Sequence, residues 1–357
     1  MVITYKLKLY PPNTDKRLLL TITALKQTEC VNYWVDKIRE LGHINLTVLQ
    51  RNYYYEARKK YGLSGVLTQC AEFTAIRIAR TSKKKRTDCP YLKTDLITTN
   101  NIRIDENNLG VAFGEGYIWF PFKGRELPEG KIRESKIKQV GNDWYCFLTI
   151  NIEQPKIKGY RRVMGVDMGL AKIATLSDWN GNNTKFFRGE SLRKKRQHYY
   201  NLRKKLQPKI KQGNVYKLLK RISEKESNWM RSKNHEISRQ IINIAIENKR
   251  AIAIENLSGI RERIKGTKKT RRMLHGWSFR QLADFITYKA RLAGLPDVLA
   301  VDPRETSRKC PKCQYVSRSN RKSQERFKCN ECRYESNADR VGAMNIAQRA
   351  TGLLASR

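Results

Sequence analysis

Residues 163–168 read VMGVDM, a short apolar run that contains one carboxylate, Asp167. A run of this length and composition is typical of a buried strand. An acidic side chain inside such a strand is costly to bury unless a cation neutralises it. A second apolar run at 173–176 and a third near Phe186 predict neighbouring strands in the same sheet. We therefore expect Asp167 on the central strand of a sheet, close to a cation.

Two further carboxylates occur in similar surroundings. Residues 251–255 read AIAIE, a second buried strand that ends in Glu255 and closely follows a predicted helix at 237–248, as in an α/β unit. Asp339 opens a predicted helix with an apolar face. Phosphodiester hydrolysis by about two Mg²⁺ or Mn²⁺ ions needs several oxygen ligands on rigid elements. Taken singly, each acid is better explained as a capping or salt-bridged residue, but together with the cysteine motif below the three predict a metal site.

Four cysteines have the spacing of metal ligands. Cys310 and Cys313 form one C-x-x-C pair, and Cys329 and Cys332 form a second pair after a spacer of fifteen residues. This spacing predicts a structural Zn²⁺ ion held by four thiolates in a zinc ribbon. Because such a site is coordinatively closed, it contributes folding energy rather than catalysis. Two disulfide bonds are the alternative, which a reducing compartment disfavours.

The N-terminal part changes its hydrophobic pattern twice. Residues 2–10 alternate between apolar and polar, as a strand does, and helical spacing then extends from 21 to about 80 with a break at 62–65. From 92 to 153 the pattern is that of β-strands, with 108–111 interpreted as a turn and a hairpin turn at 141–143. This order predicts a β-barrel or sheet that a helical insertion interrupts after its first strand.

The charge balance points to a polyanionic partner. Lys and Arg number 73 against 33 Asp and Glu, a formal net charge of +40. A compact fold with this excess repels itself unless a polyanion neutralises it, and nucleic acid is the usual one. A ribosomal or a membrane-surface protein remains the alternative. We expect these basic residues to contact nucleic acid: Arg77, Arg80, Lys84, Arg193, Lys194, Lys195, Arg196, Lys204, Lys268, Arg271, Arg318 and Arg321.

The sequence contains no apolar run of the length that crosses a membrane, and its first residues read as a strand rather than as a signal peptide. We therefore expect no membrane partner and a location in the cytoplasm or nucleoid.

The order of four motifs resembles TnpB, a family of insertion-sequence-encoded nucleases related to the type V CRISPR effectors. The motifs are GVDMG at 165–169, IENL at 254–257, TSRKCPKC at 306–313 and NADRVGAMNI at 337–346. The resemblance covers about 160–350 with specific motifs, whereas the N-terminal part matches only in organisation. It implies a multidomain α+β and α/β protein with an RNase H-like fold in its nuclease domain. The implied domains are a wedge β-barrel at 1–20 and 92–157, a helical recognition insertion at 21–91, a split RuvC nuclease domain at 158–304 and 335–357, and a zinc ribbon that binds target nucleic acid at 305–334.

The resemblance also implies an activity and partners. A monomer of a prokaryotic protein of this family holds a transposon-derived guide RNA and recognises double-stranded target DNA beside a short flanking motif, while base pairing reads the sequence. Carried over residue by residue, Asp167, Glu255 and Asp339 are the catalytic acids that bind Mg²⁺ or Mn²⁺, and the four cysteines bind Zn²⁺. The sequence does not separate a transposon-encoded protein from a small CRISPR-associated descendant.

One departure concerns the zinc knuckles. The family often has Gly after the second cysteine of each pair, whereas this chain has Gln314 and Arg333. Because Gly eases a left-handed turn, these positions predict slight strain. Four histidines, none in a cysteine-framed ββα pattern, argue against an HNH insert and an IscB-type organisation.

Two other functions stay open. Related chains that have lost their acids act as guided repressors, and the presence of all three acids favours a nuclease here. A DDE-type transposase also uses three acids on an RNase H-like fold, but the order Asp, Glu, Asp and the zinc ribbon before the last acid weaken that interpretation.

Overall fold

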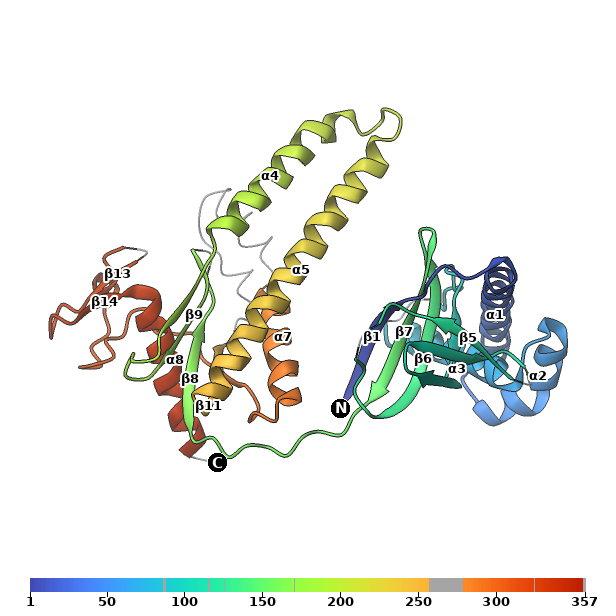
Figure 1. Ribbon diagram of the computed structural model, residues 1–357, viewed down its shortest axis with the longest axis horizontal. Helices are drawn as coiled ribbons and strands as arrows, with labels where there is room; N and C mark the ends of the chain where they lie inside the picture. The colour runs from blue at the N-terminus through green and yellow to red at the C-terminus, as the bar shows by residue number, and fades with distance from the viewer. Residues whose placement is uncertain are drawn as a thin grey trace. The chain divides into compact units, whose positions relative to one another are not determined.

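The computed structural model describes residues 1–85, 88–114, 116–124, 126–169, 171–256, 279–323 and 325–355. They form two compact units, Met1–Glu153 and Gln154–Arg357, each of which is described by itself (Figure 1).

Three helices follow the first strand of unit 1; the sequence predicted helix from residue 21 to about 80, but the first helix already begins at Thr14 and a further break falls between Leu41 and Leu46. They are α1 (Thr14–Leu41), α2 (Leu46–Tyr61) and α3 (Gly65–Lys85). The side-chain oxygen of Asn13 accepts the N–H of Lys16, and Asn45 caps α2 in the same way. The break between α2 and α3 covers 62–64, within the predicted 62–65.

The strands of unit 1 form two antiparallel sheets. One sheet has the order β1-β7-β6-β2, with β1 (Val2–Lys8), β7 (Asp143–Asn151), β6 (Lys131–Val140) and β2 (Ile97–Thr99). The other contains β3 (Ile102–Asp105), β4 (Asn108–Ala112) and β5 (Tyr117–Pro121). The predicted hairpin joins β6 to β7 through Gly141, whose φ of 66° favours a glycine. An isolated bridge from Leu9 to Phe122 links the sheets, and closure into a barrel stays a prediction.

The prediction of a turn at 108–111 is wrong. These residues lie in β4, and the turn is at Glu106 and Asn107. Gly110, in the middle of this segment, lies under the ring of Trp119, where an added Cβ would be 2.9 Å from a ring carbon. Glycine inside a strand often marks such a close approach, and sequence alone does not separate this use from a turn.

The sheet of unit 2 has the order β10-β9-β8-β11-β12. Its strands are β8 (Arg162–Asp167), β9 (Lys172–Asp178), β10 (Lys185–Arg188), β11 (Arg250–Glu255) and β12 (Leu299–Val301). β8 pairs antiparallel with β9 and parallel with β11, so Asp167 does lie on the central strand. The sheet therefore combines an antiparallel half with a parallel half that meet at β8.

Helices cover both faces of this sheet, which explains why its central strands are apolar on both sides. One face packs on α5 (Val215–Glu247) and α7 (Phe279–Leu292), and the core there includes Met164, Val166 and Ile254. Alternate residues, such as Val163 and Ala253, pack on the other face against α8 (Ala338–Ala355). A side chain at Gly165 would collide with the carbonyl oxygen of Ala343, so the glycine lets α8 cross β8 closely.

A helical hairpin extends from the sheet of unit 2 (Figure 1). It consists of α4 (Glu190–Leu206), a 3-10 turn at Gln207–Lys209, and the N-terminal part of α5. The short strands β13 (Arg326–Lys328) and β14 (Glu335–Asn337) form a separate ladder just before α8. Within the described ranges, no helix has the length and apolar character needed to cross a membrane.

Candidate functional site

The three candidate acids meet at one edge of the sheet of unit 2. Asp167 ends β8 and Glu255 ends β11, and these strands are parallel neighbours with Val166 opposite Ile254. Their last residues therefore leave the sheet at the same edge. Asp339 is the second residue of α8, whose first turns lie over this edge. An added Cβ at Gly342 of α8 would be 2.8 Å from Oδ2 of Asp167, which shows how closely the helix approaches that carboxylate.

The acids influence one another electrostatically. Burial, followed by the negative charges of Glu255 and Asp339, raises the pKa of Asp167 from 3.8 to about 8. Burial also raises the pKa of Glu255. Part-buried carboxylates that repel one another suit a divalent cation, and carboxylate oxygens are the ligands that Mg²⁺ and Mn²⁺ prefer. The donor set therefore fits such ions.

The carboxylates are not drawn into a tight cluster. Within the described part of the chain, only the cysteine quartet brings three or more possible metal ligands within 4.8 Å of one another. Two cations lie next to Asp339: Lys172 Nζ is 3.1 Å from Oδ2, and Arg321 Nη2 is 3.4 Å from Oδ1. The Thr306 hydroxyl donates to Oε1 of Glu255 at 2.5 Å, which orients that carboxylate.

Sequence reasoning missed Lys172 and Thr306 as members of this site. Thr306 opens the TSRKCPKC motif, so its position offered a signal, but nothing in the local pattern pairs it with Glu255. Arg321 was predicted to contact nucleic acid, and the structure brings it to Asp339. Whether it also contacts nucleic acid stays a prediction.

The cysteine quartet has the geometry of a four-thiolate metal site. The Sγ atoms of Cys310 and Cys332 are 3.6 Å apart, and those of Cys313 and Cys329 are 3.5 Å apart. A tetrahedral Zn²⁺ ion with bonds of about 2.3 Å sets its sulfurs roughly 3.8 Å apart, so the quartet fits this ion. The N–H of Tyr334 lowers the pKa of Cys332 to about 7, whereas burial raises the pKa of Cys310 to about 12, so a metal must displace the proton of the buried thiol.

Both knuckles contain the left-handed turn that the sequence predicts. Gln314 has a φ of 66° and Arg333 a φ of 59°, values that cost free energy for residues with a Cβ. The ribbon packs on α8 through Phe327, Ala338 and Val341, so the cysteine site and Asp339 are parts of one packed assembly.

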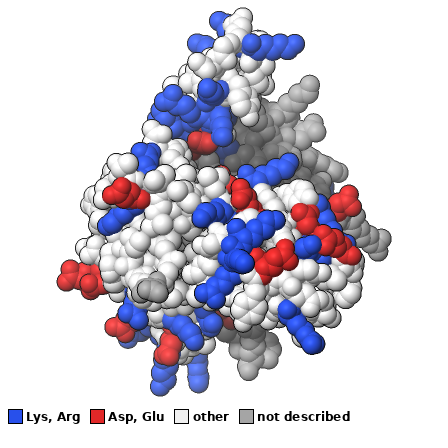
Figure 2. Space-filling model, turned by 90° about the vertical axis from the view of Figure 1, so that its right-hand side faces the viewer, with Lys and Arg blue, Asp and Glu red and all other residues white. Residues whose placement is uncertain are grey.

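The other predicted contact residues are mostly at the surface, and their role in binding nucleic acid stays a prediction. Those with exposed side chains are Arg77, Arg80, Lys84, Lys194, Lys195, Lys204 and Arg318. Arg193 donates to the carbonyl of Ala171, and Arg196 pairs with Glu226 at 3.4 Å. Lys268 and Arg271 lie outside the described residues. Figure 2 shows Lys and Arg side chains spread over one face of the molecule, with Asp and Glu among them.

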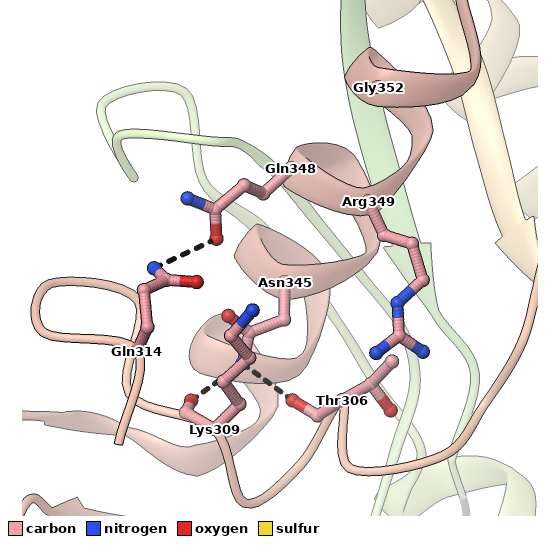
Figure 3. Close-up of a pocket in the computed structure, with 7 residues that line it drawn as sticks. All are labelled: Thr306, Lys309, Gln314, Asn345, Gln348, Arg349 and Gly352. Carbon is pink, nitrogen blue, oxygen red and sulfur yellow. Dashed lines mark hydrogen bonds between the residues drawn. The ribbon is translucent and has the colours of Figure 1, made fainter. Parts of the chain in front are cut away.

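A polar pocket of about 350 Å³ lies between the ribbon and α8 (Figure 3). Asn345 donates to the backbone carbonyls of Thr306 and Lys309, both at 2.7 Å, and thus fixes the segment that presents the Thr306 hydroxyl to Glu255. Gln314 and Gln348 face each other across the pocket, 3.4 Å apart. The pocket residues are Thr306, Lys309, Gln314, Asn345, Gln348, Arg349 and Gly352.

Comparison with known proteins identifies relatives for most of unit 2. A family model described as a probable transposase, OrfB of IS605, matches residues 148–261, and a model of the TNB domain of Cas12f1-like proteins matches residues 279–346. A TnpB-like protein of Methanocaldococcus jannaschii is 32% identical over 199 residues, which are 54% of this chain and 70% of that protein. The chain belongs to the TnpB family.

Other relatives of this TnpB-family chain are named nucleases. The CRISPR-associated endodeoxyribonuclease Cas12f1 of Sulfoacidibacillus thermotolerans is 29% identical over 58% of this chain, which spans only 50% of that protein. The putative RNA-guided DNA endonuclease InsQ of Escherichia coli K12 is 27% identical over 71% of this chain and 65% of its own length. The structure of a mini-RNA-guided CRISPR-Cas endonuclease aligns with a TM-score of 0.52 over 98% of this chain and 92% of that one; at 12% identity this shows a shared fold.

Proposed function

We propose that the chain is an RNA-guided DNA endonuclease. It uses a transposon-derived guide RNA to recognise double-stranded DNA next to a short flanking motif and cleaves it in a single RuvC-type site. The observation that carries the proposal is the meeting of Asp167, Glu255 and Asp339, from three distant parts of the chain, at one sheet edge. Burial there, followed by the charges of Glu255 and Asp339, raises the pKa of Asp167 to about 8. The net charge of +40 and the family membership support nucleic acid as the substrate.

In this proposal the three carboxylates hold about two Mg²⁺ or Mn²⁺ ions. When bound, the ions supply an activated water and stabilise the leaving oxygen of the phosphodiester. The protein's own contribution is to fix the acids. The Thr306 hydroxyl orients Glu255, and the N-terminal turn of α8 presents Asp339. Arg321 lies beside Asp339, and its planar guanidinium suits a phosphate oxygen of the strand.

The four-cysteine site binds Zn²⁺ in this proposal and takes no part in the chemistry. Its thiolates fold the short ribbon at 310–332, which carries Arg321 to the acids. A chain that bears many phosphate contacts also binds its nucleic acids with a steep salt dependence. We propose that the protein acts as a monomer on its guide RNA.

The test is cleavage by protein that is co-expressed with its RNA. Sequencing of the co-purified RNA identifies the guide, and a plasmid matched to it should be linearised in Mg²⁺. The Asp167→Ala variant should lose cutting and keep guided binding nearly intact, whereas Asp284→Ala, which alters an exposed acid on α7, should cut like the wild type.

Three outcomes contradict the proposal. Guided binding by the wild type without any cutting indicates a repressor, and strand transfer of element ends indicates a transposase. If the protein is isolated free of RNA and its binding to nucleic acid depends only weakly on salt, the proposal of RNA guidance is wrong.

A further inference from the structure

Lys172 contacts four residues at the edge of the candidate nuclease site, one of which, Glu325, has its Oε1 3.9 Å from the ammonium. It begins β9, and its side chain is only 13% exposed. Its Nζ atom lies 3.1 Å from Oδ2 of Asp339 and 3.1 Å from Oδ1 of Asn337. The ammonium also lies 4.6 Å from the centre of the Phe186 ring, which limits where the side chain can move.

The Asn337 contact ties Lys172 to the start of α8. Oδ1 of Asn337 accepts the backbone N–H groups of Asp339 at 3.1 Å and Arg340 at 3.3 Å. This is the bonding pattern of a helix N-cap, so the lysine contacts both the capping oxygen and the carboxylate that the capped turn presents. Lys172 is thus held at Asp339 by two independent contacts.

The cations of the site are distributed unevenly. Lys172 and Arg321 each contact one oxygen of Asp339. Among the described residues, no ion pair involves Asp167 or Glu255. Asp167 and Glu255 therefore have no described cation at ion-pair distance, so a divalent cation that binds there displaces no ammonium or guanidinium group. At Asp339 an incoming cation must either share the carboxylate with the ammonium of Lys172, which is 3.1 Å away, or displace it.

We propose that Lys172 is a positioning residue that competes with divalent cations for Asp339. It holds this carboxylate in place before metal binds, and it makes the second of the two ions bind more weakly than the first. The inference rests on the proposed function, because it takes the three acids to be metal ligands. It extends that function because Lys172, which is not one of the three acids, determines the order in which the two ions bind.

The experiment counts Mn²⁺ ions bound to the full chain without nucleic acid, by titration with detection of free Mn²⁺ by electron paramagnetic resonance. The Lys172→Met variant keeps an apolar stem against Phe186 and loses the charge. Removal of the positive charge beside Asp339 should lower the dissociation constant of the second Mn²⁺ ion about tenfold or more and leave that of the first nearly unchanged. Lys172→Arg should retain weak second binding, and Lys185→Met, at an exposed lysine on β10, should behave like the wild type.

A second readout uses the Mg²⁺ concentration for half-maximal plasmid cleavage, which should fall in Lys172→Met and stay unchanged in Lys185→Met. Thermal melting establishes that each variant is folded. If Lys172→Met instead destabilises the chain, Lys172→Gln, which keeps a polar contact to Asn337, takes its place with the same expected tightening.

Mn²⁺ binding by the Asp167→Asn variant distinguishes failure of this inference from failure of the proposed function. If Asp167→Asn binds as many Mn²⁺ ions as the wild type, the acids are not metal ligands and the proposed function itself is wrong. If Asp167→Asn loses an ion while the isotherms of Lys172→Met and wild type coincide, the nuclease site stands and the role of Lys172 is overturned.

Discussion

The charge on Asp167 has a free-energy cost that can be measured. The Asp167→Asn substitution replaces the carboxyl group with an amide of nearly the same shape, which is neutral at every pH and needs no proton to stay uncharged in the folded protein. In the absence of Mg²⁺ we expect this variant to be more stable than the wild type at neutral pH. This is unusual for a change at the centre of a site, because most substitutions destabilise.

The size of the effect follows from the pKa of Asp167. Its folded value of about 8 exceeds its ordinary value of 3.8, so the folded protein retains a proton that the unfolded chain has released between these values. The stabilisation from this proton is fully present below pH 4 and is lost as pH rises through 8, by about 1.4 kcal/mol per pH unit. Between pH 3.8 and 7 the loss has an upper limit of about 4 kcal/mol, which we halve to about 2 kcal/mol because the side chain is partly in contact with solvent.

The assay compares thermal or denaturant unfolding of wild type, Asp167→Asn and the surface control Asp284→Asn after dialysis into Mg²⁺-free buffer without chelator, which leaves zinc bound. At pH 7 Asp167→Asn should melt roughly 4–8 °C higher than the wild type. The difference should shrink toward pH 4. Addition of Mg²⁺ should stabilise the wild type more than the variant, which lacks one of the three carboxylates. A variant that is less stable than the wild type without Mg²⁺, or that gains equally from Mg²⁺, would refute the reasoning.

Three further predictions concern the ribbon and α8. Removal of zinc by a strong chelator should unfold the ribbon and abolish cutting even in excess Mg²⁺, which zinc analysis and limited proteolysis can follow; cutting that survives complete zinc loss would contradict a structural role. Arg333→Gly should stabilise the protein by about 1 kcal/mol in denaturant unfolding, because it relieves a left-handed backbone at 59° in an exposed residue; an unchanged or lower midpoint would show that the turn is unstrained. Gly342→Ala favours α-helix but places a Cβ 2.8 Å from Oδ2 of Asp167, so we expect a folded protein whose Mg²⁺-induced rise in melting temperature is at least halved; an undiminished rise would mean that α8 does not press on that carboxylate.

Local patterns were sufficient for much of the architecture. Apolar runs identified β8 and β11, glycine spacing identified the break between α2 and α3, and cysteine spacing identified the quartet. The turn predicted at 108–111 failed because Gly110 serves packing against Trp119 rather than chain reversal. A single residue type with two uses cannot be resolved without knowledge of its neighbour.

The sequence by itself determined which residues carry chemistry: three carboxylates at the ends of buried elements, four thiolates at metal spacing and an excess of positive charge. These signals are local, because strand alternation, knuckle spacing and composition depend on neighbours in the chain. Only the tertiary structure decided how the carboxylates are compensated. Lys172 and Arg321 reach Asp339 across 167 and 18 residues of sequence, and Thr306 reaches Glu255 across 51. Such contacts arise from the packing of α8 and the ribbon on the sheet edge, and electrostatic energy depends on distance in space rather than on separation along the chain.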